Sequence, residues 1–405
     1  MIAHREKPRL LVVNLYYRPG FEATAQLLGD LCEALSAQFD VTVVTGELAI
    51  PPAPRGRFEA NGVHVLRVPS TTFDRAALGR RALNYMTFLL SAFVEGLRAK
   101  RPDVVLCMTD PPIVGDVALG IARRFRAPLV VISQDVFPEI AVQLGRIENP
   151  IFIGLLRGLI RFYVRRADRL VVIGETMRSR LIDKGARRDR IVVIPNWVDT
   201  TKVVPSPRDN AWARENGFDD RFVVMHSGNI GHAQNLDALV RSATFLRDMD
   251  DLTLAIVGGG ARRAALEELV DRLETDAVEF LPYQPRELLS LSLSSADIHV
   301  VGLARGLAGY VVPSRLYGIL AAGRPVLVAA DEESETAQLV RRVGCGFVVP
   351  PGRPELLAEA IRRAHDGEYD LDDMGRRGRE YVVTEADRSV AVGRYERLLL
   401  ELVNA

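Results

Sequence analysis

A short helix with an arginine at its start is the segment of this chain best suited to bind an anion. Within residues 312–323, Ser314 predicts a helix N-cap and Gly323 predicts the stop that ends the helix. Arg315 then falls in the first turn, where its charge opposes the helix dipole unless an anion binds. The free N–H groups of that turn favour a phosphate. A capped helix with a solvated arginine is the alternative, and the spacing alone does not separate the two.

Two glycine-containing turns precede this helix, and each follows an expected strand. Members of the first turn are Gly228, Asn229, Gly231 and Gln234. Glycines there let the backbone approach a ligand phosphate, although a plain tight turn explains them equally well. The second turn holds three consecutive glycines, Gly259 among them, followed by Arg262. For this turn we favour glycines that only redirect the chain, with approach to a ligand as the alternative.

A carboxylate stands directly after another expected strand, residues 128–132. Asp135 would therefore lie at the carboxyl end of a sheet, where ligands of such sheets bind. It could hydrogen-bond a sugar hydroxyl or take a proton from an acceptor. An equally good explanation is that Asp135 caps the helix that follows.

The order of the expected elements indicates an α/β chain with two doubly wound domains. Continuous apolar runs alternate with helical patterns, which is typical of parallel sheets covered on both faces. The expected strands are 9–15, 41–45, 63–67, 103–108, 128–132, 169–174 and 191–195, then 221–226, 252–258, 277–281, 297–301, 325–329 and 346–349. A linker is expected at 199–219, and residues 389–403 form a helix without a following strand. The natural ligand site of such a pair is the cleft between the domains.

Composition excludes several classes of protein. The 405 residues carry 52 Lys and Arg against 52 Asp and Glu, which argues against a protein that coats nucleic acid. Three distant cysteines and six scattered histidines predict neither a disulfide framework nor a metal site. The Asp-x-Asp at 248–250 reads as a solvated turn. The start of the chain lacks the pattern of a signal peptide, so a cytoplasmic location is expected.

Two apolar segments could contact a membrane surface. One carries arginines at helical spacing, and the other has no charged residue. Residues 151–166 combine Arg157, Arg161 and Arg165 with apolar side chains, and residues 83–94 are uncharged. Together they could form a basic, apolar patch on an anionic lipid surface, which would place the protein at the inner face of the plasma membrane. Ordinary core packing with a solvated face is slightly favoured over this patch.

Together these motifs resemble the family-4 glycosyltransferases, which have the GT-B fold of two Rossmann-like domains. The closest subgroup resembles the transferases of bacterial surface polysaccharides. The resemblance covers nearly the whole chain and rests on residues 16–19 with 23–24, 135–139, 194–199, 227–231, 313–317 and 322–326. It implies an acceptor domain at 1–200, a nucleotide-sugar domain at 201–385, and a helix at 386–405 that crosses back onto the first domain.

The resemblance also implies a retaining transfer from a nucleotide-sugar, UDP-linked by preference, with no metal and no cofactor. The acceptor would be a polyprenyl-linked saccharide, and a nucleic acid is not expected as a partner. Asp135 and Arg315 are the implied catalytic residues. Implied donor-binding residues are Gly228, Asn229, Gly231, Gln234, Gly259, Arg262, Tyr283, Pro313, Ser314, Leu316 and Tyr317. Implied acceptor-binding residues are Glu22, Thr24, Asp110 and Pro111.

The chain departs from the family pattern at the two glutamates that normally lie eight positions apart. Tyr310 and Gly318 stand at those positions, so recognition of the ribose must differ. Further departures are Gln234 for the family's lysine, His232 for its arginine and Glu22 for its glycine. Arg315, with Arg262 as a second candidate, must carry more of the diphosphate charge. A nucleotide-sugar epimerase and a non-catalytic partner subunit remain alternatives, whereas a nicotinamide dehydrogenase is disfavoured because residues 16–23 hold only one glycine.

Overall fold

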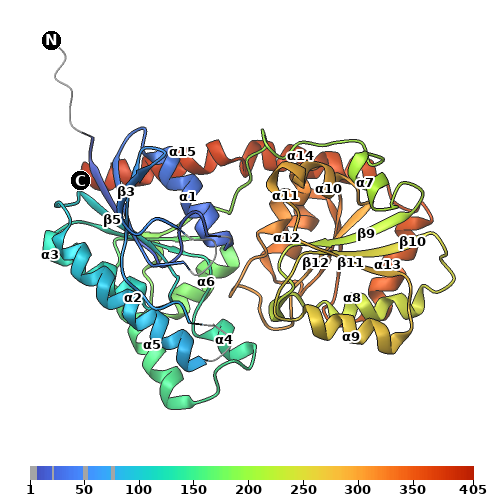
Figure 1. Cartoon of the computed structure of the whole chain (residues 1–405), viewed down its shortest axis with the longest axis horizontal. Helices are drawn as coiled ribbons and strands as arrows, with labels where there is room; N and C mark the ends of the chain where they lie inside the picture. The colour runs from blue at the N-terminus through green and yellow to red at the C-terminus, as the bar shows by residue number, and fades with distance from the viewer. Residues whose placement is uncertain (1–6, 21, 49–52, 74–77) are drawn as a thin grey trace, which may run out of the picture. The chain divides into compact units, whose positions relative to one another are not determined.

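The computed structural model describes residues 7–20, 22–48, 53–73 and 78–405. The chain forms two compact units, of which the first runs up to Ile194 and also contains Val392–Ala405. The second unit is Pro195–Ala391. Each unit is a parallel-sheet α/β structure, so the expected fold class is confirmed (Figure 1).

The first unit is built on a twisted sheet that is parallel apart from one edge strand. Its strands are β1 (Arg9–Val13), β2 (Asp40–Thr45), β3 (Gly56–Ala60), β4 (Val63–Arg67), β5 (Val104–Met108), β6 (Leu129–Ser133), β7 (Arg169–Val172) and β8 (Ile191–Val193). They lie in the order β3-β4-β2-β1-β5-β6-β7-β8, and only β3 pairs antiparallel with its neighbour. Strands β5 and β6 are fully buried apolar runs, as expected for central parallel strands.

Helices cover this sheet, and three of them form one continuous layer. The helices of the first unit are α1 (Ala23–Leu35), α2 (Leu78–Arg98), α3 (Val114–Phe125), α4 (Glu139–Gln143), α5 (Pro150–Val164) and α6 (Glu175–Asp183), with most of α15 (Arg388–Val403). Helix α3 packs between α2 and α5, and the three lie side by side in Figure 1. Glycines allow the close packing, because a Cβ at Gly115 would lie 2.6 Å from the Tyr163 ring.

Strand β3 is the one strand of the described chain that the apolar pattern did not predict. It is an exposed edge strand that pairs with β4 through a turn at Asn61 and Gly62, both with positive φ. An exposed strand buries too few side chains to produce an apolar run. The Asn-Gly pair is a hairpin signal that could have revealed it.

The second unit has a fully parallel sheet. Its strands are β9 (Phe222–Ser227), β10 (Leu252–Val257), β11 (Val278–Leu281), β12 (Ile298–Gly302), β13 (Val326–Ala329) and β14 (Gly346–Val349), in the order β11-β10-β9-β12-β13-β14. Its helices are α7 (Ala211–Glu215), α8 (Asp237–Ser242), α9 (Arg263–Leu273), α10 (Leu289–Ser294), α11 (Arg315–Ala321), α12 (Glu335–Val343), α13 (Pro354–His365) and α14 (Leu371–Glu385). The core contains Leu254, Ile256, Ile298 and Leu327, each at most 1 % exposed.

The turns after β9, β10 and β12 approach one another so closely that they require glycine. A Cβ at Gly258 would lie 2.0 Å from the Gly228 carbonyl oxygen, and one at Gly302 would lie 2.0 Å from the Gln234 carbonyl oxygen. Gly258 also has φ +140°, which L-residues rarely adopt. We favoured the explanation that the glycines of the second turn only redirect the chain. Close contact with the turn after β9 is a second reason why glycine is needed there.

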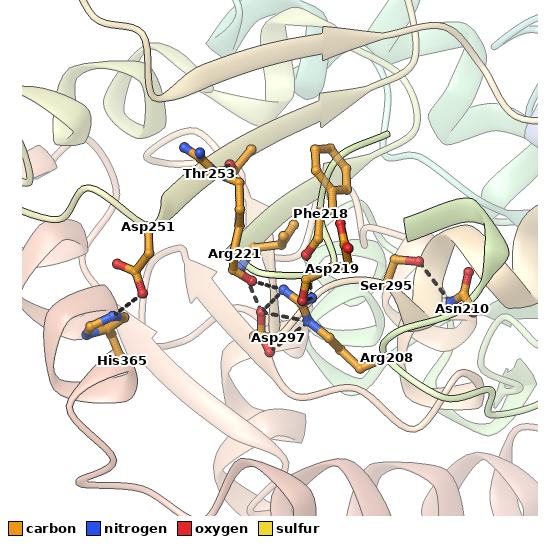
Figure 2. Close-up of polar contacts among 11 residues, drawn as sticks. Arg208, Asn210, Phe218, Asp219, Arg221, Asp251, Thr253, Ser295, Asp297 and His365 are labelled. Atoms are coloured by element: carbon orange, nitrogen blue, oxygen red, sulfur yellow. Dashed lines mark hydrogen bonds and ion pairs between the residues drawn. The ribbon is translucent and has the colours of Figure 1, made fainter. Parts of the chain in front are cut away.

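Residues 199–219 belong to the second unit, so the expectation of a domain linker there is corrected. Figure 2 shows the polar contacts that hold part of this segment. Arg208 pairs with Asp297 at 2.9 Å and donates to the carbonyl oxygens of Phe218, Asp219 and Arg221. Asn210 caps α7 and donates to the Ser295 hydroxyl. The segment is held by polar side chains and therefore shows little hydrophobic periodicity in its sequence. For that reason it resembled a linker.

Helix α14 was also absent from the sequence prediction. It contains Gly375 and Gly378, and glycine is unfavourable inside an isolated helix. A Cβ at Gly375 would lie 2.1 Å from the Gly323 carbonyl oxygen. The glycines therefore let α14 pack closely on the end of α11. Arg379 of the same helix donates to the carbonyl oxygens of Thr200, Val203 and Ala321.

Replacing Gly258 with alanine is expected to destabilise the second unit by about 1–3 kcal/mol, because of its φ and the Gly228 carbonyl. Gly318→Ala is the matched control: its Cβ would meet only Leu293, at 3.7 Å, so a gain of about 0.5–1 kcal/mol is expected. Urea unfolding followed by tryptophan fluorescence reports this unit alone, since Trp197 and Trp212 both lie in it. Equal effects of the two substitutions would contradict the close-packed turns.

Candidate functional site

Arg315 lies at the carboxyl end of β9, held by groups of the turn that follows this strand. Its Nη1 donates to the carbonyl oxygen of Ser227 at 3.3 Å and also contacts the His226 ring. Its Nη2 donates to the carbonyl oxygen of Asn229 at 3.1 Å. The guanidinium is therefore fixed between α11 and the β9 turn by neutral partners.

The charge of Arg315 is not balanced by an acidic side chain. Within the described ranges, no carboxylate lies within ion-pair distance of its guanidinium. Burial lowers the pKa of Arg315 to about 10, so the side chain remains cationic at neutral pH. Burial and the adjacent Arg315 charge also hold the pKa of His226 well below its usual range. A neutral histidine under a cation leaves a net positive site that suits an anion.

The turn itself uses its N–H groups within the fold. The Gly228 N–H donates to the Val257 carbonyl at 2.8 Å, and the Gly231 N–H donates to the Gln234 side chain at 3.0 Å. For the first glycine turn, approach of the backbone to a phosphate and a plain tight turn were equally good explanations, and these two N–H groups are engaged within the protein. Its carbonyl groups instead orient Arg315. Gly228 leaves room for the guanidinium, because a Cβ there would lie 3.4 Å from the Arg315 Cζ.

Two further candidates come from the neighbouring turns. The Tyr283 hydroxyl donates to the Gly259 carbonyl at 3.2 Å, while 58 % of Tyr283 remains exposed. The ring packs over Gly259, since a Cβ at that glycine would touch it at 3.4 Å. Arg262 is paired with Asp237 at 2.7 Å, so its charge is already balanced. Arg315 is therefore the better candidate for the negative charge of a ligand.

The donor-binding candidates on and before helix α11 differ in how exposed their side chains are. Leu316 and Tyr317 are 0 % and 1 % exposed, so their side chains pack in the core and only their backbone could reach a ligand. Pro313 is also buried. Ser314 is the N-cap residue of α11, as expected, although its side chain makes no cap hydrogen bond. Gly323 ends the helix with φ +71°, as expected.

A second polar cluster lies at the carboxyl ends of β5 and β6 in the first unit. The Thr24 hydroxyl donates to the Asp110 carboxylate at 3.4 Å, and burial together with nearby Asp110 raises the pKa of Asp135 to about 7. Asp135 does not cap α4, because that helix begins after Pro138 without a side-chain cap. The capping alternative is thus removed, and a carboxyl group that titrates near neutral pH remains.

The other acceptor candidates contribute less. Pro111 is buried, and Glu22 precedes α1 without capping it. The Arg81 guanidinium, by contrast, interacts electrostatically with Asp110 and Tyr16. Sequence reasoning did not select Arg81 or His226. His226 carried a signal, because it ends an apolar strand directly before the glycine turn, but a buried neutral histidine is commonly structural.

Two further observations bound the chemistry of the described chain. Among its residues, no group of three or more His, Cys, Asp or Glu side chains is arranged to hold a metal ion. None of its helices combines the length and the apolarity needed to cross a membrane.

Comparisons with known proteins identify the family of the chain. Residues 23–197 match the model of the glycosyl transferase 4-like domain, and residues 208–381 match that of glycosyl transferases group 1. The chain is 26 % identical over 374 residues to the putative colanic acid biosynthesis glycosyl transferase WcaI of Escherichia coli K12, covering 88 % of this chain and 92 % of the relative. It is also 26 % identical over 374 residues to the probable glycosyltransferase WbjE of Pseudomonas aeruginosa, covering 91 % of each.

Solved structures show the same fold at low sequence identity. Anabaena HepE in complex with UDP aligns with a TM-score of 0.74 and 15 % identity, covering 97 % of this chain and 100 % of that one. Sucrose-phosphate synthase of Thermosynechococcus elongatus aligns with a TM-score of 0.81 and 18 % identity, covering 98 % and 99 %. Since the two family models divide the chain as its two sheets do, this protein belongs to the family-4 glycosyltransferases of the GT-B fold and is a transferase enzyme.

Proposed function

We propose that this enzyme moves a sugar from a UDP-linked donor to a lipid-linked saccharide in the synthesis of a bacterial surface polysaccharide. The observation that carries the proposal is the unbalanced Arg315 guanidinium at the β9 turn. Charge grows on the leaving diphosphate as the glycosidic bond breaks, and a fixed cation stabilises that charge. Because neutral groups hold Arg315 before the ligand arrives, little reorganisation is needed at the moment of reaction.

We choose UDP because a structurally similar protein binds it and because the second unit has an aromatic side chain on which a base could stack. HepE, which has the same fold, has been solved with UDP and with UDP-glucose. The half-exposed Tyr283 ring beside Gly259 offers an apolar face near the end of β10, where a base could stack. Tyr310 and Gly318 replace the usual glutamates, so the ribose must find other partners in this enzyme.

The acceptor is proposed to bind at the Thr24, Asp110 and Asp135 cluster of the first unit. Asp135 has a pKa of about 7, and its carboxylate form can take the proton of an acceptor hydroxyl. A saccharide acceptor fits the similarity to WcaI, a putative glycosyl transferase of colanic acid biosynthesis. A lipid carrier is proposed because surface polysaccharides of this kind are assembled on one.

The replaced glutamates favour one alternative, a non-catalytic partner subunit of an active transferase. Such a protein would retain the fold and the turn contacts but would not turn over any nucleotide-sugar. Arg315 argues for activity, because a cation without an acidic partner is costly to retain in a site that binds no anion. The turnover of the unmodified enzyme therefore decides between the two.

Arg315→Ala is expected to lower turnover by about 10²–10³-fold, because the leaving diphosphate loses its fixed cation. Release of UDP from a panel of UDP-sugars, with a lipid-linked saccharide present, measures this. Arg341→Ala is the matched control, since Arg341 is an exposed arginine of the same unit that is paired with Glu332. Near-normal turnover of Arg315→Ala would overturn the assignment, and absence of turnover in the unmodified enzyme would favour the partner subunit.

The transfer is expected to retain the anomeric configuration and to need no metal ion. Proton coupling constants of the donor and of the product should show the same configuration at the transferred anomeric carbon. Turnover should persist in excess EDTA, because Arg315 takes the role that a divalent cation has in metal-dependent transferases. An inverted product, or activity that returns only with added Mg²⁺ or Mn²⁺, would contradict the proposal.

The pH dependence of kcat/KM should contain an acidic limb near pH 7, because Asp135 must lose its proton to act as a base. Asp135→Asn should remove this limb and lower activity at pH 8 by about 10²–10⁴-fold. A stability control is available, because the folded-state pKa of Asp135 is raised. Its contribution to stability is complete below about pH 4 and is lost as pH rises through about 7. Asp135→Asn should therefore melt like the unmodified enzyme near pH 4 and increasingly higher than it as pH rises, with the full difference above about pH 7. An unchanged activity profile would exclude Asp135 as the base.

A further inference from the structure

Helix α5 is apolar on the side that faces solvent as well as on the side that faces the core. Ile153, Ile160 and Tyr163 are buried against the first unit. On the opposite side, Ile151 is 83 % and Leu155 is 59 % exposed, and Phe152, Leu159 and Phe162 are also exposed. A helix that is apolar all round normally has a partner on each side.

Helix α2 exposes a second apolar stripe. Leu83, Met86, Leu90, Phe93 and Val94 recur at helical spacing and are all exposed, with Leu90 at 64 %. Phe88 and Ala92 occupy the buried side of the same helix. We call the exposed apolar side chains of α2 and α5 together the apolar face.

The two stripes belong to one layer, because α3 packs against both helices (Figure 1). Phe93 of α2 lies over Gly120 of α3, where a Cβ would meet the ring at 3.0 Å. The Phe162 ring of α5 lies 4.0 Å from the Arg166 guanidinium and 5.6 Å from that of Arg123 on α3. Side chains of all three helices thus contribute to a continuous surface.

The net charge around the apolar face is positive. Residues 78–98 and 150–166 contain seven arginines and one acidic residue, although the whole chain has a net charge of zero. That acidic residue, Glu95, pairs with Arg98 at 2.8 Å. Arg161 on α5 and Arg165 and Arg166 directly after it are exposed, as are Arg123 and Arg124 on α3. Glu139 balances Arg157 at 3.2 Å, and both carboxylate oxygens of Asp116 on α3 are buried. The exposed charge at this face is therefore positive.

We propose that the apolar face docks on an anionic phospholipid membrane, with the arginines at the headgroups and the apolar side chains in the interface. A helix with exposed Leu, Ile and Phe and flanking arginines is suited to lie in the plane of such an interface. A second copy of the chain fits less well, because a symmetric contact would place arginines against arginines. The proposal goes beyond sugar transfer, and it also explains how a lipid-linked acceptor would reach the first unit.

The membrane surface would lie close to the acceptor candidates. Arg81, near the start of α2, interacts electrostatically with Asp110, whereas the apolar stripe of the same helix begins at Leu83. One helix therefore connects the docking surface with the polar cluster at the carboxyl end of the first sheet. A headgroup-sized acceptor could stay attached to its lipid while it reacts.

Vesicle flotation tests the proposal with the full chain. The protein should float with phosphatidylcholine vesicles that contain about one third phosphatidylglycerol at low salt, and much less with pure phosphatidylcholine. High salt should weaken binding, because the arginine contribution is screened. Leu155→Ser and Leu90→Ser should each weaken binding on the order of tenfold. Arg161→Gln should weaken it about fivefold at low salt only.

Phe245→Ser is the matched control, because Phe245 is 52 % exposed on the second unit and should not affect flotation. Circular dichroism melting verifies that each variant is folded. No flotation of the unmodified protein at low salt, or equal flotation of Leu155→Ser, would overturn the proposal. A lipid-free dimer that Leu155→Ser converts to a monomer, without flotation of either, would identify the face as a contact between copies.

A thermal shift with UDP keeps this test separate from the proposed function. Leu155→Ser should keep the same UDP shift as the unmodified protein, because Leu155 lies on the first unit and the donor turns on the second. Flotation without any UDP shift would support the membrane surface and count against the donor. A UDP shift without flotation would support UDP as the donor nucleotide and count against the membrane surface.

Discussion

A guanidinium that is held by carbonyl groups is the interaction on which the donor end of the second unit depends. Arg315 needs the carbonyl oxygens of Ser227 and Asn229, and these point toward it only because the β9 turn is folded tightly against the β10 turn. That approach in turn requires glycine at 258, and the positive φ of residue 228 favours glycine there. Carbonyl dipoles stabilise the cation without cancelling its charge. An anion at about 4 Å would still gain about 4 kcal/mol at an effective dielectric constant of about 20.

The sequence was sufficient for the elements that bury apolar side chains. Each expected strand is present, because central parallel strands such as β5 and β6 must be apolar on both faces. The elements it missed are those held by other means. Strand β3 is exposed, and the 199–219 segment is held by Arg208 and its carbonyl partners. Helix α14 contains Gly375, which is disfavoured in isolated helices but required beside Gly323.

The candidate site was predictable in part, for a related reason. Arg315 and Asp135 stood out because charged side chains followed turn signals at the ends of expected strands. Which groups neutralise a charge is set by contacts between distant segments, and these cannot be read from spacing. The sequence therefore left Arg262 as a second candidate beside Arg315, although Asp237 pairs with Arg262 and neutralises its charge. The same limit hid His226, whose role depends on the Arg315 side chain 89 positions away.

Helix α15 has a consequence for how the protein is made. Val392–Ala405 belong to the first unit, whose other residues end at Ile194. Buried side chains of this helix include Tyr395 and Leu399, both 0 % exposed. At a ribosome speed of about 5–20 residues per second, these residues emerge roughly 10–40 s after Ile194. During that interval the nascent first unit lacks this helix, so part of its apolar surface stays uncovered while the whole second unit is still being translated.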